Sequence, residues 1–237
     1  MLTPLLIIAI FLLAGFVQGM TGFGSALVAI PLLSLFLDIK SAVPLCILNS
    51  LIITTYLSLK MRKHLHSNKI LPLCVAAVPG IIVGSTILKN VDSTILRTCI
   101  GVLLISYSLY SLLNRATPRK LSTAWSYLAG FLSGAIGAAF SAGGPPTIIY
   151  TTLTDWKKDE IKATLSGFFL FNSYLIATVH AISGLTSIEV FTYFMISAPF
   201  VLLGTVLGAI AYGRIPRARY LQIIFAFLIV MGIMMVV

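Results

Sequence analysis

The chain has 237 residues, of which 59% are hydrophobic and only 9% charged, and its formal net charge is +10. Because ordinary soluble domains contain about a quarter charged residues, this composition excludes a water-soluble fold and predicts an all-α polytopic membrane protein. The basic residues lie in short loops between apolar segments, a pattern typical of topology signals rather than of nucleic-acid binding. We therefore expect a single membrane domain over residues 1–237, with the lipid bilayer as its surroundings and no nucleic-acid partner.

Eight apolar segments follow one another along the chain. We place them at residues 4–37, 42–59, 70–88, 94–113, 122–154, 163–183, 188–212 and 220–237. Six of them have the length of one transmembrane helix, about 20 residues. The first and the fifth are longer and contain several glycines. Each of these two is too long for one straight span, so we expect a helical hairpin, re-entrant or short, broken at the glycines.

The two halves of the chain share a sequence pattern. Residues 14–31 read AGFVQGMTGFGSALVAIP and residues 129–146 read AGFLSGAIGAAFSAGGPP. Further landmarks follow in the same order, namely Asn49-Ser50 with Asn172-Ser173, and Pro79 and Gly84 with Pro199 and Gly204. Three landmarks in one order predict a duplication, with repeat one at about 1–115 and repeat two at about 121–237.

The positions of Lys and Arg distinguish two topologies. If all eight segments cross once, 7 of these residues are cytoplasmic and 9 are outside. If the first and fifth segments enter and return on one side, 13 are cytoplasmic and 3 are outside, which agrees with the positive-inside rule. The second topology makes the repeats inverted, a common plan in secondary transporters. Both termini are then outside, and hairpin arms of about 16 residues, or about 24 Å, end inside a core about 30 Å thick.

The two glycine-rich breaks contain candidate binding groups. Non-helical backbone inside a membrane is tolerated where it lines a cavity, and the free N–H groups at the start of the next helix attract anions. We assign Gly19, Thr21, Gly22, Gly24 and Ser25 to the first break and Gly134, Gly137, Ser141, Gly143, Gly144, Pro145 and Pro146 to the second. The alternative is that these glycines only let helices pack closely.

Three polar side chains lie inside apolar segments. Asn49 and Asn172 occupy equivalent places, and each is either a donor to a bound anion or an interhelical hydrogen-bonding residue. His180 is either a carrier of a coupling proton or an interfacial histidine. No Asp or Glu lies deep in a span, which argues against a cation substrate. The candidate substrate-binding residues are Thr21, Gly22, Gly24, Ser25, Asn49, Gly137, Ser141, Gly143, Gly144 and Asn172.

On these residues the chain resembles the sulfite exporter TauE/SafE family. The resemblance rests on AGFVQGMTGFGSALVAIPLL, on AGFLSGAIGAAFSAGGPPTIIY, on the LNS and FNS helices and on the Pro-x4-Gly helices. It covers nearly the whole chain and implies a multi-pass transporter of the cell (plasma) membrane. The implied substrates are small sulfur-containing anions, such as sulfite, sulfoacetate or other organosulfonates, usually exported. The first break reads GFGSA, whereas the most glycine-rich members have a longer glycine run.

Three functions remain to be compared. The first is a secondary transporter that works by alternating access, with the anion held at the two breaks. The second is a transporter or passive channel for another small anion. The third is a membrane-embedded enzyme, which needs a nucleophile, base or metal set; the three histidines and the sequence around His180 offer little for one. We expect no catalytic residue, no cofactor and no metal. The expected partner is a small anionic substrate, and a homodimer is left open.

Overall fold

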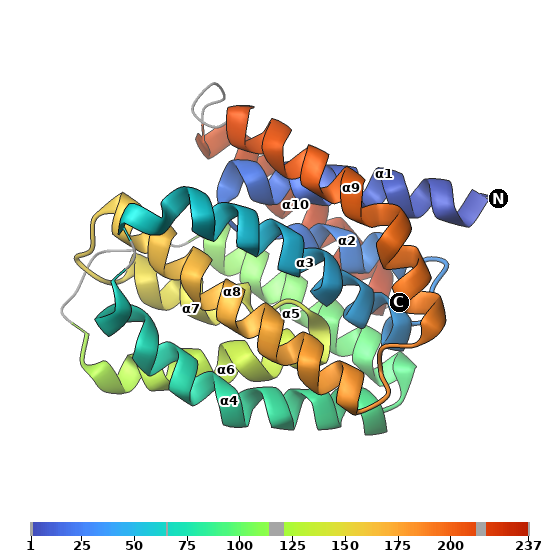
Figure 1. Cartoon of the computed structure of the whole chain (residues 1–237), viewed down its shortest axis with the longest axis horizontal. Helices are drawn as coiled ribbons and strands as arrows, with labels where there is room; N and C mark the ends of the chain where they lie inside the picture. The colour runs from blue at the N-terminus through green and yellow to red at the C-terminus, as the bar shows by residue number, and fades with distance from the viewer. Residues whose placement is uncertain (1, 65, 114–120, 212–216, 237) are drawn as a thin grey trace.

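The computed structural model describes residues 2–64, 66–113, 121–211 and 217–236 (Figure 1). Within these ranges the chain is helical and contains no strand, so the all-α prediction is confirmed. The helices are α1 (Leu2–Thr21), α2 (Ser25–Leu33), α3 (Ile39–Met61), α4 (Ser67–Asn90), α5 (Ser93–Leu113), α6 (Thr123–Phe140), α7 (Gly144–Thr152), α8 (Lys158–Ile182), α9 (Ile188–Ala211) and α10 (Arg217–Val236), with a 3-10 turn at Arg62–His64.

The bundle is built for lipid. In the described part of the chain, α1, α3, α4, α5, α8 and α9 are long and apolar enough to cross a membrane. Large apolar side chains lie on the outer surface, and Ile82, Val102 and Leu203 are 57%, 52% and 50% exposed. In water such a surface would be unfavourable, whereas hydrocarbon solvates it. The chain is therefore a multi-pass membrane protein.

The first and fifth apolar segments each contain one long and one short helix. α1 has 20 residues and α2 has 9, and α6 has 18 and α7 has 9. The expectation of equal arms of about 16 residues is therefore wrong. At 1.5 Å per residue, the long arm reaches about 27–30 Å and the short arm about 14 Å. Only the short arms end well inside the thickness of a bilayer core.

Close packing explains why the long arms stay helical past their first glycines. α1 lies beside α9, and α6 lies beside α4 (Figure 1). A Cβ atom at Gly19 would lie 2.2 Å from the carbonyl oxygen of Thr205, and one at Gly134 would lie 2.5 Å from that of Ala77. Gly19 and Gly134 therefore belong to helix contacts and not to the breaks. For these two residues the close-packing alternative is correct.

Three basic residues tie together the helix termini at one end of the bundle, which we call the Lys89 end. The Lys40 ammonium donates to the backbone oxygen of Lys89 at 3.2 Å, and the Lys89 ammonium donates to that of Ser183 at 3.0 Å. The Arg97 guanidinium donates to the backbone oxygen of Ser34 at 2.5 Å. The end of α2 therefore lies with the ends of α4 and α8 and with the start of α5.

The opposite end of the bundle, which we call the Lys69 end, joins the starts of α4 and α8. The Lys69 ammonium lies 3.0 Å from Oε1 of Glu160 and 4.7 Å from the ring centroid of Trp156. Trp156 lies four residues after Thr152, the last residue of α7, so α7 ends near this end of the bundle. The short helices α2 and α7 thus run toward opposite ends of the bundle (Figure 1).

Candidate functional site

A cavity of about 60 Å³ lies between the two non-helical segments, residues 22–24 and 141–143. Its walls come from both of these segments and from α3 and α8. Seven of the ten candidate residues line it: Gly24, Ser25, Gly137, Ser141, Gly143, Gly144 and Asn172. Two segments more than 100 residues apart in the sequence are thus brought to one place.

The first segment is shaped by glycine and held by an amide. Gly24 has a φ of +95°, a conformation that favours glycine. The Ser25 hydroxyl donates to Oε1 of Gln18, and the Ser25 N–H donates to the same atom at 3.3 Å. Gln18 is 5% exposed and lines the cavity. Sequence reasoning missed Gln18, although a lone amide in the apolar α1 segment was the available signal.

The second segment turns at Ser141. This residue has a φ of +54° and is the one residue other than glycine with a positive φ among those described. Its N–H donates to the carbonyl oxygen of Gly137 at 2.8 Å, which ends α6. The Ser133 hydroxyl donates to the backbone oxygen of Gly143 and accepts from Thr147 at 2.6 Å. Backbone strain of this kind concentrates at functional sites.

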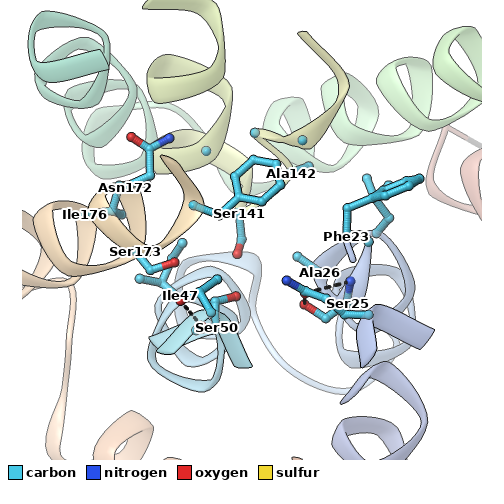
Figure 2. A pocket seen from close by; sticks show the side chains of 18 residues that line it. Phe23, Ser25, Ala26, Ile47, Ser50, Ser141, Ala142, Asn172, Ser173 and Ile176 are labelled. Carbon is cyan, nitrogen blue, oxygen red and sulfur yellow. Dashed lines mark hydrogen bonds between the residues drawn. The ribbon is translucent and has the colours of Figure 1, made fainter. Parts of the chain in front are cut away.

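The Ser141 hydroxyl points into the cavity. Figure 2 shows it at the centre of the view, directed toward the part of α3 that carries Ser50, with the Ser173 hydroxyl on the adjacent wall. The Ser141 oxygen is buried and has no hydrogen-bond partner in the protein. An unpaired hydroxyl at this depth is costly, and this one leaves a donor and an acceptor free at the cavity wall.

The two Asn-Ser pairs contribute to the cavity unequally. Both serines, Ser50 and Ser173, line it, but of the two asparagines only Asn172 does. Asn172 is buried, its Oδ1 has no partner, and its amide is turned away from the Ser141 hydroxyl (Figure 2). The serine that follows each asparagine is therefore the shared element of the pattern.

Asn49 bridges two helices and lies outside the cavity lining. Its Nδ2 donates to the hydroxyl of Ser197 on α9 at 3.0 Å and to the backbone oxygen of Leu45 at 3.0 Å. The Ser197 hydroxyl lies 3.1 Å from Asn49 Oδ1. The prediction that both asparagines face one cavity is therefore wrong for Asn49, and the interhelical alternative is correct for it. The amide satisfies its hydrogen bonds within the bundle, as a buried polar group must.

Thr21 and Gly22 lie at the end of α1, outside the cavity lining. The Thr21 hydroxyl donates to the backbone oxygen of Val17 at 2.8 Å, so it closes the helix. Gly22 has a φ of +88°, and a Cβ atom there would lie 3.8 Å from Cε of Lys162. A cationic side chain from α8 therefore lies against the first break. No feature of the sequence predicts this contact, because Lys162 is distant in the chain from Gly22 and follows two other lysines, Lys157 and Lys158.

His180 is fully buried and lies apart from the cavity. Its Nε2 is 3.0 Å from the backbone oxygen of Ala138 on α6, and its Nδ1 is buried without a partner. Its side chain therefore faces α6 from the last turn of α8. A role in proton coupling stays a prediction.

The cavity is electrically neutral in its side chains and positive in its backbone dipoles. None of the residues that line it is Asp, Glu, Lys or Arg. The helices α2 and α7 both begin at its wall, at Ser25 and Gly144. The Ser25 N–H is already bonded to Oε1 of Gln18, and Pro145 and Pro146 have no N–H. The two helix starts therefore act mainly through the partial positive charge of the helix dipole. Such an arrangement favours an anion over a cation.

Comparison with known proteins agrees with these features. Residues 7–235 match the model of the family described as sulfite exporter TauE/SafE. No curated protein and no solved structure matches the chain. Because the family match covers nearly the whole chain, the protein belongs to the TauE/SafE sulfite exporter family of membrane transporters.

Proposed function

We propose that this protein exports a small sulfur-containing oxyanion by alternating access and that the anion is held in the cavity between the two helix breaks. The observation that carries the proposal is the convergence of two helix N-termini on one cavity that also holds an unpaired, buried hydroxyl. The dipoles of α2 and α7 supply attraction, and the Ser141 hydroxyl supplies a donor with no competing partner. The anion would complete the hydrogen bonding that the protein leaves open.

The size of the cavity favours sulfite over larger organosulfonates. One water molecule needs about 10–15 Å³ on this scale, so a cavity of about 60 Å³ holds only a few atoms of that size. Sulfite consists of one sulfur and three oxygens and is of this size. Sulfoacetate carries an additional carboxymethyl group and would require the walls to move apart.

The packing of the long arms suggests how access alternates. α1 is fixed to α9, and α6 is fixed to α4, by glycine contacts in which backbone meets backbone. We infer that these two pairs move as rigid units relative to α3 and α8, which contact each other between them. We also propose that the two repeats, about 1–115 and about 121–237, are inverted copies, each with a broken hairpin and three helices. Rocking of one unit against the other would open the cavity to one face at a time.

A ligand series measured by thermal unfolding tests the proposed site. A ligand that binds only the folded state adds about 2.7 kcal/mol to the unfolding free energy at 100 times its dissociation constant. We expect sulfite to raise the midpoint temperature of the purified protein more than sulfoacetate does, and choline, a cation, to leave it unchanged. If sulfoacetate stabilises more than sulfite, the size argument fails. If no anion stabilises the protein, the site is wrong.

A further inference from the structure

A large apolar groove runs along the outside of the second hairpin. It has a volume of about 650 Å³ and lies between α5 and the hairpin of α6 and α7, which is within the range of about 300–1,000 Å³ typical of ligand pockets. Its walls are mainly apolar and include Leu128 and Leu132 of α6 and Ile149 of α7. The corresponding side of the first hairpin differs, because α10 packs against α2 there.

The groove lies at the depth of hydrocarbon. α5 is one of the candidate membrane spans, and α7 forms the opposite wall over its whole length. The nine residues of α7 rise about 14 Å, close to half of a bilayer core about 30 Å thick. The groove, measured along α7, therefore extends over about the thickness of one leaflet.

A polar pocket continues the groove at the Lys69 end of the bundle. This pocket has a volume of about 430 Å³ and shares Leu121 and Tyr150 with the groove. Lys69, Asp155 and Trp156 are among its lining residues. An apolar groove of about one leaflet's depth thus lies next to a polar pocket at the end of the bundle.

The charged groups of the pocket are of both signs. The Lys69 ammonium is held 3.0 Å from Glu160 and 4.7 Å from the Trp156 ring centroid. Asp155 is exposed. The rings of Tyr150 and Trp156 meet edge to face at 5.9 Å. A cation can bind a phosphate, whereas a carboxylate beside aromatic rings suits an ammonium group.

We propose that one zwitterionic phospholipid, with a phosphate and an ammonium in its headgroup, binds at this place. One acyl chain lies in the groove between α5 and α7. The phosphate lies near Lys69, and the ammonium lies near the exposed carboxylate of Asp155. A second copy of the chain fits this surface less well, because it would have to cover the charged pocket as well as fill the apolar groove.

The bound lipid would also support the candidate anion site. Pro145 and Pro146 line the groove, and they directly follow Gly143 and Gly144, which line the anion cavity. The start of α7 is therefore the wall between lipid and anion. An acyl chain packed against the prolines would hold that wall in place.

Native mass spectrometry of the delipidated, detergent-solubilised full chain tests the proposal. We expect one phosphatidylethanolamine per monomer, bound about tenfold more tightly than phosphatidylglycerol, which lacks the ammonium. Leu128→Trp and, separately, Leu132→Trp should fill the groove and reduce the bound fraction about tenfold. Leu203→Trp, on the exposed face of α9, is the matched control and should bind as the unmodified protein does.

A further variant tests the headgroup assignment. Asp155→Asn should weaken phosphatidylethanolamine binding and leave phosphatidylglycerol binding unchanged. The proposal is overturned if the groove variants and Leu203→Trp retain lipid equally, since the lipid would then be non-specific. It is also overturned if the two lipids bind equally to the unmodified protein, or if a dimer forms that Leu128→Trp abolishes.

Discussion

Ser141 combines a left-handed backbone conformation with a buried hydroxyl that has no partner in the protein. Replacing Ser141 by Ala removes the hydroxyl and keeps the backbone. A hydrogen bond to a charged group contributes about 1.5–3 kcal/mol, so Ser141→Ala should weaken sulfite binding about tenfold to hundredfold. The unfolding midpoint without ligand should change little, because no hydrogen bond within the protein is lost. Isothermal titration with sulfite measures the first quantity and thermal unfolding the second.

Ser85 provides the matched control for that prediction. Its hydroxyl is also buried without a partner, but Ser85 lies on α4 and outside the cavity lining. Ser85→Ala should therefore bind sulfite as the unmodified protein does. Equal affinity in both variants would remove Ser141 from the site.

Gly143→Leu is unsuitable as a test, because a Cβ atom there would lie 2.3 Å from the Ser133 carbonyl oxygen.

The two asparagines should respond differently to the same substitution. Asn49→Leu leaves the Ser197 hydroxyl without its Asn49 partner, so we expect a loss of about 1–3 kcal/mol in stability. Asn172→Leu breaks no hydrogen bond within the protein, so stability should change little. Because Asn172 lines the cavity, the apolar side chain should make the cavity less polar and lower sulfite affinity. Thermal unfolding with and without sulfite separates the two effects. Equal changes in stability and in sulfite affinity for the two variants would contradict the different roles given to Asn49 and Asn172.

At the residue scale, local sequence signals predicted which residues lie at the cavity, while the binding role of these residues stays a prediction. Glycines next to hydroxyl residues indicated both breaks, and seven of the ten candidates line the cavity. Sequence reasoning failed where the environment depends on distant helices. Asn49 differs from Asn172 only because Ser197 lies opposite it, and Lys162 reaches Gly22 only in the folded chain.

At the scale of the elements, glycine fixes the long arms to their partner helices. A Cβ atom at Gly84 would lie 2.1 Å from the Ala135 carbonyl oxygen, and one at Gly208 would lie 2.1 Å from that of Phe16. Gly84→Ala and Gly208→Ala should therefore each destabilise the protein by about 1–3 kcal/mol, since the helices must move apart. Thermal unfolding of both variants and of the unmodified protein measures this loss of stability.

Val83→Leu is the control for the glycine variants. It also adds one carbon to α4, but Val83 is 45% exposed on the outer face. Its unfolding midpoint should stay close to that of the unmodified protein. A similar decrease in Val83→Leu and Gly84→Ala would mean that α4 and α6 do not meet through glycine.

The eight predicted apolar segments coincide with α1–α2, α3, α4, α5, α6–α7, α8, α9 and α10. Hydrophobicity determined these positions, so they could be read from the sequence. The lengths of the hairpin arms could not, because the point where a helix ends depends on glycine contacts with helices from the other half of the chain. The same glycines were read as break residues for that reason.

At the scale of the whole molecule, three basic residues distant in the sequence gather at one end of the bundle. Lys40, Lys89 and Arg97, which the inverted topology predicts to be outside, lie together at the Lys89 end. The contact of Gly101 with Gly232 brings the last turns of α10 toward the same end. The predicted loop at 116–120 and most of the one at 213–219 fall outside the described residues, so their side of the membrane stays a prediction.

Cysteine labelling tests the topology. In a background with Cys46, Cys74 and the exposed Cys99 replaced, single cysteines are placed at Ser67, Asp155 and Asp92. The inverted topology predicts that an impermeant reagent labels position 92 in intact cells and leaves positions 67 and 155 protected until the cells are opened. Labelling at 155 with protection at 67 would support eight simple crossings instead.

Counterflow of sulfite in liposomes containing the purified protein tests the central claim most directly. A transporter that alternates access exchanges its substrate, so uptake of labelled sulfite should saturate with concentration. It should also run several-fold faster into liposomes that contain unlabelled sulfite than into empty ones. Uptake that rises linearly with concentration and ignores internal sulfite, or no uptake at all, would contradict the account.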